Sequence, residues 1–352
     1  MLQPSAPAHA APPPVPTAPR VVVMTDFPPL DVIPVKACGP ASPRERCSDP
    51  DDIQSMVRLL LYGNELDIEG LVASAATLAN VARKRPLLEL LDRYAQVQPA
   101  LAQHDPRYPA AATLKLRTWQ GLDGAWGTPK FGTPARPLEQ LLGPELDTEA
   151  SDALIRIVDR PDPRPVWVLG WGGSREIAQA LWRVRQTRSA DALARFVAKL
   201  RLYLVARQDG TTDWLLAEFP SLFIILSERH YMAMFSQSGP DPRLTDLDWL
   251  DRHVRRGHGP MAAAYPASGW DPAATGQQEG DSPSFLHLVG ALRGVNDAER
   301  PGQPGWGGQF QQPDPSRNHW FDHRQGDKAI LRAKAQMQAE FAERTSWMRD
   351  VP

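Results

Sequence analysis

The stretch Val21-Val22-Val23-Met24-Thr25-Asp26 decides the fold, together with Asp49-Pro50-Asp51-Asp52, which follows a Pro-rich segment. The first stretch is a continuous apolar run typical of a buried strand, and Asp26 stands directly after it. The later aspartates open an amphipathic helical pattern. Four carboxylates gathered at the end of a buried strand need a cation to neutralise them, and an all-oxygen shell suits a hard ion such as calcium or magnesium. These residues therefore predict a metal site.

The same aspartates have a second interpretation. Asp49 could cap the helix that begins near Asp51, and Asp51 and Asp52 would then be favoured in its first turn by the helix dipole. Asp26 would be an ordinary loop residue after the strand. The four residues alone do not separate a metal site from helix caps, so the rest of the chain has to decide.

Composition and charge limit the class of protein. The chain has 352 residues, of which 42% are hydrophobic and 23% charged, which is typical of one large or two ordinary soluble domains. A formal net charge of −2 gives no electrostatic reason to expect nucleic acid or an anionic membrane as partner. The longest apolar runs are far shorter than the roughly 20 residues of a membrane span. We therefore expect neither a nucleic-acid nor a membrane partner.

Proline and cysteine usage points to export. Residues 1–19 are mainly Ala and Pro and predict a disordered leader, in which Ala8-His9-Ala10 resembles a signal cleavage site without the apolar region before it. The two cysteines, Cys38 and Cys47, both lie in the Pro-rich segment 27–48, and we favour a disulfide over two free thiols. We expect a secreted or periplasmic protein with a truncated signal region, with the cytoplasm as the alternative.

Strand and helix patterns alternate along the chain. Strands are predicted at 20–25, 68–73, 165–170 and 201–206, and helices at 51–64, 87–96, 147–158, 174–185, 190–200 and 328–348, with an irregular stretch at 236–278. This order predicts one α/β domain over residues 20–352, with a mainly parallel, twisted open sheet flanked by helices. Ligands bind at the carboxyl ends of the strands in such sheets, and this rim would carry Asp26, Ser74, Trp171, Gln208 and Asp209.

With these segments in order, the chain resembles the nucleoside hydrolase superfamily, and more narrowly its branch named for a nucleoside-hydrolase-like domain in cellulose-binding proteins. The resemblance covers most of residues 20–348. The matching stretches are Val22-Val23-Met24-Thr25-Asp26, Asp49-Pro50-Asp51-Asp52-Ile53, Asp67-Ile68-Glu69-Gly70-Leu71, Trp167-Val168-Leu169-Gly170-Trp171-Gly172-Gly173, Glu279-Gly280-Asp281-Ser282-Pro283-Ser284-Phe285-Leu286 and Gly305-Trp306-Gly307-Gly308.

The resemblance implies one bound calcium ion. By position, its ligands would be the carboxylates of Asp26, Asp52 and Asp281 and the backbone carbonyl of Trp171, while Asp51 would face the sugar hydroxyls. Six to eight oxygen ligands leave room in such a shell for a water molecule and two substrate hydroxyls. Further sugar contacts are expected from a separate group of residues, Ser74, Gln208, Asp209 and Trp214.

The resemblance also implies a reaction. A metal-bound water, deprotonated by Asp26 as general base, would attack the anomeric carbon and hydrolyse a glycosidic or N-glycosidic bond. The partner would be a small-molecule sugar, a nucleoside or a glycan, and self-association into a homo-oligomer stays open. The alternative is a secreted, non-catalytic carbohydrate-binding protein that keeps the hydrolase fold, and a third interpretation is a structural module whose carboxylates only cap helices.

The sequence departs from the family pattern in two places. Typical members have only a few residues between the first aspartate and the paired aspartates, whereas residues 27–50 separate them here. That insertion could cover the site as a lid, or could move Asp26 out of register so that Asp31 or Asp49 replaces it. The second departure is Gly280, which stands where many members have a histidine associated with leaving-group protonation. No general acid is evident in its place.

Other aromatic and histidine residues are weaker candidates. Sugars stack on aromatic rings, and four of the eleven tryptophans are candidates for such contacts: Trp126, Trp171, Trp214 and Trp306. No pair of histidines has the spacing of a zinc site. We expect surface or capping positions for His230, His253, His258 and His287.

Overall fold

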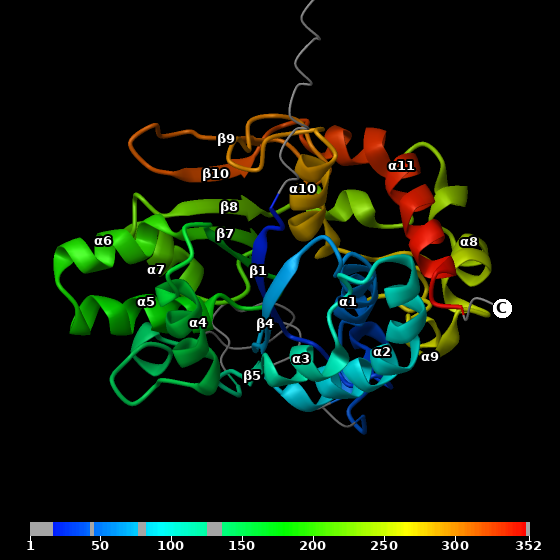
Figure 1. Ribbon diagram of the computed structural model, residues 1–352, viewed down its shortest axis with the longest axis horizontal. Helices are drawn as coiled ribbons and strands as arrows, with labels where there is room; N and C mark the ends of the chain where they lie inside the picture. The colour runs from blue at the N-terminus through cyan, green and yellow to red at the C-terminus, as the bar shows by residue number, and fades with distance from the viewer. Residues whose placement is uncertain (1–16, 43–45, 77–81, 125–135, 350–352) are drawn as a thin grey trace, which may run out of the picture.

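The computed structural model describes residues 17–42, 46–76, 82–124 and 136–349 (Figure 1). Most of the predicted leader and the candidate Trp126 lie outside these residues. Within the described ranges, every helix is too short or too polar to cross a lipid bilayer.

An eight-stranded sheet forms the centre of the fold, in the order β5-β4-β1-β6-β7-β8-β10-β9. All neighbouring strands are parallel except the last pair, β10 and β9. The α/β prediction with a mainly parallel sheet is therefore confirmed. The strands are β1 (Arg20–Thr25), β4 (Asp67–Ala73), β5 (Thr118–Gln120), β6 (Val166–Gly170), β7 (Leu200–Val205), β8 (Phe223–Ser227), β9 (Phe310–Gln311) and β10 (His319–Asp322).

Helices cover both faces of this sheet (Figure 1). Side chains of β1 alternate between the faces, so that Val21 and Val23 enter one core while Val22 and Met24 enter the other. The first core is closed by α1 (Asp51–Leu61), α2 (Lys84–His104), α3 (Ala111–Leu116), α8 (Leu247–Leu250), α9 (Gly259–Ala263), α10 (Ser282–Leu292) and α11 (Asp327–Ser346). The second is closed by α4 (Glu149–Asp159), α5 (Arg175–Thr187), α6 (Ala190–Ala198) and α7 (Thr211–Glu218).

The predicted elements occur, with shifted ends. The helix expected at 87–96 is longer, because its apolar stripe stays buried as far as Leu101. Pro99 lies within α2 and is exposed. The helix expected at 51–64 ends at Leu61. The irregular stretch 236–278 contains only short helical pieces, among them α8 and α9.

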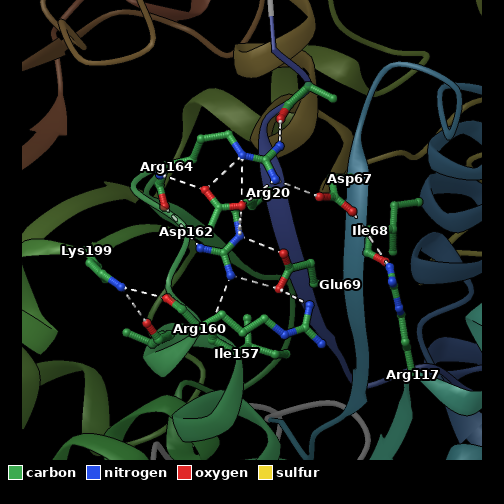
Figure 2. A network of polar contacts seen from close by, with 12 residues as sticks. Arg20, Asp67, Ile68, Glu69, Arg117, Ile157, Arg160, Asp162, Arg164 and Lys199 are labelled. Atoms are coloured by element: carbon green, nitrogen blue, oxygen red, sulfur yellow. Dashed lines mark hydrogen bonds and ion pairs between the residues drawn. The ribbon is translucent and has the colours of Figure 1, made fainter.

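A buried ion-pair network closes the amino-terminal end of the sheet (Figure 2). Arg20, the first residue of β1, pairs with Glu69 of β4 at 2.6 Å, and neither side chain is more than 3% exposed. Arg20 also donates to the carbonyl oxygens of Ile157 and Arg164, at 2.8 and 3.1 Å. These contacts tie β1, β4 and the end of α4 together, and leave the carboxyl ends of the strands for a ligand.

The Pro-rich insertion is closed by a disulfide. Cys38 and Cys47 are bonded, which confirms the pairing predicted from the sequence. Next to the bond, β2 (Ile33–Pro34) and β3 (Cys47–Ser48) form a separate two-stranded parallel sheet. Since Cys47 lies two residues before Asp49, the disulfide fixes the approach of the chain to the aspartates.

Removing this disulfide is expected to destabilise the protein. The two cysteines are 9 positions apart, and a loop of this size contributes roughly 2–3 kcal/mol to the free energy of unfolding through the entropy of the unfolded chain. Urea denaturation of Cys38→Ser/Cys47→Ser beside the oxidised parent protein measures the difference. Equal midpoints and slopes for the two proteins would contradict the expectation.

Candidate functional site

A cavity of about 420 Å³ opens at the carboxyl ends of β1, β6 and β7. Its wall includes Ala206, which follows β7 with a φ of 60°, a left-handed conformation that costs a non-glycine residue energy and that often marks a functional site. The lining residues are Asp26, Asp49, Asp51, Asp52, Trp171, Val205, Ala206, Gln208, Tyr231, Met232, Phe235, Gln237, Trp270, Asp271, Ala274, Gln278 and Asp281.

Carboxylates from three parts of the chain converge in this cavity. Asp26 follows β1, Asp51 and Asp52 form the first turn of α1, and Asp281 immediately precedes α10. Asp51, Asp52 and Asp281 each offer a carboxylate oxygen within 4.8 Å of those of the other two. Such a group of oxygen donors could hold a hard cation.

Helix capping accounts for only part of this cluster. The Asp49 carboxylate accepts a hydrogen bond from the backbone N–H of Asp51, the first residue of α1, at 3.3 Å, although Pro50 occupies the cap position. Asp281 occupies the cap position of α10, but its side chain makes no capping hydrogen bond. Its Oδ2 atom is buried and has no hydrogen-bond partner among the described residues. An unpaired buried carboxylate oxygen is costly, and a bound cation would remove that cost.

Neighbouring residues hold the side chains of Asp26 and Asp52 in place. The hydroxyl of Thr25 donates to Oδ1 of Asp52. Gly172 packs so closely that a Cβ there would lie 2.9 Å from the Asp26 backbone nitrogen, from Asp26 Oδ1 and from the Ser74 hydroxyl. Only glycine fits between them, so the loop after β6 holds the Asp26 carboxylate in place.

Burial and mutual repulsion raise the pKa values of the clustered carboxyls. Burial raises the pKa of Asp52 to about 7, against hydrogen bonds from Thr25, Asp51 and Asp26 that lower it. Burial, followed by the charges of Asp49 and Asp281, raises the pKa of Asp51 well above its ordinary value. The pKa of Asp281 is raised in the same way by burial and by Asp52. Without a cation, the ionised cluster therefore opposes folding.

The cation-free protein is expected to lose stability as the pH rises. The pKa of Asp52 is about 7 in the folded protein against 3.8 ordinarily, so its favourable contribution is complete below about pH 4 and is lost as the pH rises through about 7. At 1.36 kcal/mol per pKa unit, the contribution of Asp52 to the free energy of unfolding falls by on the order of 4 kcal/mol over this pH range.

Urea denaturation in chelator at about pH 5 and pH 8 tests this slope, with Asp52→Asn as the matched control. Buried histidines such as His258 and His287 have lowered pKa values and give the opposite slope, but they are common to both proteins. The parent protein should therefore lose stability relative to Asp52→Asn as the pH rises. A stability difference that does not change with pH would contradict the prediction.

The carbonyl predicted to complete the metal site also lies at this cavity. Trp171 is buried after β6, and its carbonyl oxygen accepts a hydrogen bond from Nε2 of Gln208 at 3.0 Å. Its indole donates to the Ser284 hydroxyl at 2.7 Å, and Ser284 donates in turn to the carbonyl of Asp281 at 2.7 Å. Trp171 thereby links the loop after β6 to the segment that carries Asp281.

Several sequence-predicted residues do not reach the cavity. Asp209 is buried and accepts hydrogen bonds from the backbone N–H groups of Arg175 and Thr211, at 3.1 and 2.8 Å, so it joins the starts of α5 and α7. Trp214 packs edge-on against Phe219. Ser74 lies next to Gly172, and Trp306 packs against Gly290 of α10. Asp31 pairs with Arg46 at 2.9 Å.

The expected surface positions are wrong for His230 and His287, whereas His258 is buried but occupies the cap position of α9, as the capping alternative expects. His230, His258 and His287 are each no more than 3% exposed, and only His253 is partly exposed. The Nε2 atoms of two buried rings contact backbone carbonyls: His230 that of His323 at 2.8 Å, and His287 that of Ala298 at 3.0 Å. Nδ1 of His230 lies 3.1 Å from Oδ1 of Asp322, and Nδ1 of His287 has no hydrogen-bond partner among the described residues.

The aromatic wall of the cavity was not predicted from the sequence. Tyr231, Phe235 and Trp270 line it, and burial together with the charges of nearby aspartates raises the pKa of Tyr231 to about 12. Lys36, from the insertion, lies 3.9 Å above the Trp270 ring and 2.5 Å from the carboxylate of Asp271. The insertion therefore contacts the rim of the cavity, while Asp26 and Asp49 both stay in its lining.

Comparisons with known proteins agree with this architecture. The solved structure of a nucleoside hydrolase-related hypothetical protein from Saccharophagus degradans, described as associated with carbohydrate metabolism, is 29% identical. The match has a TM-score of 0.74 and covers 94% of this chain and 72% of the other. A type III effector protein, XopQ, in complex with adenosine diphosphate ribose, is 12% identical over 95% of this chain and 94% of its own, with a TM-score of only 0.39, and carries no argument.

Sequence comparison identifies the family. No curated protein matches the chain. The family model described as "Cellulose-binding Sde182, nucleoside hydrolase-like domain" matches residues 45–310, which include Asp51, Asp52, Trp171 and Asp281. The chain belongs to the family of the nucleoside hydrolase-like domain of cellulose-binding Sde182.

Proposed function

We propose that this protein is a calcium-dependent hydrolase of a glycosidic or N-glycosidic bond. The observation that carries the proposal is the convergence of Asp51, Asp52 and Asp281 in one cavity, with an unpaired oxygen on Asp281. Buried carboxylates with raised pKa values and a cavity large enough for a sugar are typical of an active site.

The donors present fit a calcium ion. Asp26, Asp52 and Asp281 would supply carboxylate oxygens and Trp171 its carbonyl, while Asp51 would face the hydroxyls of the sugar. All are hard oxygen donors, as calcium prefers, and burial and mutual repulsion raise the pKa values of Asp51, Asp52 and Asp281, a direction that supports binding of a positive charge. When bound, the ion would supply positive charge that neutralises the carboxylates and orients sugar hydroxyls.

The other lining residues support a sugar substrate. Asp26, at the end of β1, would accept the proton of an attacking water molecule. Tyr231 stays protonated, since its pKa is about 12, and could donate a hydrogen bond to a leaving group. Its ring lies 3.2 Å from the position of a Cβ at Gly280. Trp270 and Phe235 offer apolar faces on which a sugar ring or a base can stack.

A hydrolysis screen tests the proposal. Purified protein is incubated with nucleosides and with aryl glycosides, in calcium or in chelator, and release of free base or aryl alcohol is measured. The proposal expects turnover of at least one substrate in calcium and its loss in chelator. Asp31→Asn should turn over the same substrates as the parent protein, because this carboxylate is exposed and pairs with Arg46 outside the cavity. Turnover unaffected by chelator would contradict the calcium requirement.

A non-catalytic carbohydrate-binding protein is the second candidate. Two observations favour it: the glycine at position 280, which offers no acidic group, and the cellulose-binding description of the family. Saturable, calcium-dependent binding of a sugar or glycan without release of product would support this candidate over the hydrolase.

The same family description and the disulfide also favour a secreted or periplasmic location. Fractionation of the native host cells tests it, because a protein found only in the cytoplasm would contradict export.

A further inference from the structure

Two buried polar side chains of α1, those of Gln54 and Arg58, bind the segment 276–279. Gln54 accepts a hydrogen bond from the backbone N–H of Gln278 at 2.6 Å. It donates to the carbonyls of Pro266 and Gly276, at 3.0 and 3.2 Å. The side chain is fully buried, so each of these contacts replaces water that the backbone groups would otherwise need.

Arg58 lies one helical turn further along the same face of α1. Its Nε atom pairs with Oε2 of Glu279 at 2.6 Å, and neither side chain is exposed. Arg58 also donates to the side-chain oxygen of Gln338 at 2.5 Å, and its guanidinium group lies 3.9 Å above the ring of Phe341. Glu279 in turn accepts from the hydroxyls of Tyr265 and Ser282, at 2.6 and 2.8 Å.

These contacts join the two elements that carry the acid cluster. Asp52 lies two residues before Gln54 on α1, and Asp281 lies two residues after Glu279. The carboxylates of Asp52 and Asp281 repel each other, and Oδ2 of Asp281 has no hydrogen-bond partner among the described residues that would hold it near α1. The close approach therefore has to be held by neighbouring groups, and Gln54 and Arg58 are placed to do so.

We propose that Gln54 and Arg58 are positioning residues, which hold Asp281 at the distance from Asp52 that a cation requires. The inference rests on the proposed calcium site and names the residues that set its affinity. An ordinary core role predicts only a loss of stability when either residue is replaced. A positioning role predicts a loss of cation affinity that other, equally destabilising substitutions do not cause.

Calcium titration calorimetry separates the two roles. The variants are Gln54→Met, Arg58→Met and Arg58→Lys, and the matched control is Arg20→Met. Arg20 forms an equally buried pair with Glu69 (Figure 2). Arg20 is the first residue of β1, so it lies at the opposite end of this strand from Asp26. Gln54→Met and Arg58→Met are expected to weaken calcium binding ~10–100-fold. Arg58→Lys should recover part of this loss, and Arg20→Met should lower the Tm while changing the Kd by less than about 2-fold.

The calcium affinities of these variants decide whether Gln54 and Arg58 position Asp281. Calcium affinities equal to that of the parent protein in both Met variants would overturn it and leave the proposed site intact. A comparable loss in Arg20→Met would also overturn it, since affinity would then follow global stability. If circular dichroism shows that Arg58→Met does not fold, Gln54→Met carries the comparison alone. Absence of calcium binding to the parent protein would overturn the proposed function and this inference together.

Discussion

Replacing Asp281 by Asn should abolish calcium binding and, in the same protein, raise the stability of the cation-free state. The two effects have one cause. The carboxylate is almost fully buried beside Asp51 and Asp52, and its Oδ2 atom has no hydrogen-bond partner among the described residues. Removing its charge relieves repulsion when no cation is bound, by about 1.4 kcal/mol for each unit by which the pKa is raised. It also removes a ligand carboxylate, which should abolish measurable calcium binding.

Thermal unfolding with and without calcium measures both effects at once. The parent protein should show a low Tm in chelator and a higher Tm in calcium, because a ligand that binds only the folded state stabilises it. Asp281→Asn should start from a higher Tm in chelator and gain nothing from calcium. The exposed Asp31, replaced by Asn, should behave as the parent protein does. A drop in Tm for Asp281→Asn in chelator would show that this carboxylate is a structural group rather than a cation ligand.

Replacing Asp26 by Asn should lower kcat for any hydrolysed substrate by ~10²–10⁴-fold, the usual contribution of a general base. Asn keeps the size of the side chain, so it fits beside Gly172 and retains the local packing. It cannot accept the proton of a water molecule at neutral pH.

The measurement is kcat at saturating calcium, so that weaker cation binding does not enter the comparison. Substrate affinity should change much less than kcat. Full activity in Asp26→Asn would remove this residue from the proposed chemistry and leave the base to be found elsewhere in the cavity.

The parts of the site that were predictable are those with a local signature. Asp26 directly follows an apolar strand, and Asp51 and Asp52 open an amphipathic helix, so the parallel sheet alone brings them to one rim. Asp281 lies far along the chain, and only the resemblance to a family connected it with them. The structure brings these residues to one cavity.

Other parts depend on contacts that leave no local pattern. Gln208 and Asp209 are consecutive, yet Gln208 lines the cavity while Asp209 turns away and accepts hydrogen bonds from the first backbone N–H groups of α5 and α7. Tyr231 lies in a short 3-10 helix, His230–Met234, and Trp270 lies in an irregular segment, and neither has an apolar periodicity that would mark it as a cavity wall. The burial of His287 depends on a carbonyl eleven positions away, which only the folded chain reveals.

Calorimetric titration of calcium into chelator-treated protein, with Asp52→Ala measured beside it, tests the central claim most directly. The carboxylate oxygens of the cluster predict saturable binding of calcium to the parent protein, and loss of that binding in Asp52→Ala. The same affinity in both proteins, or no binding in either, would contradict the claim that these carboxylates form a cation site.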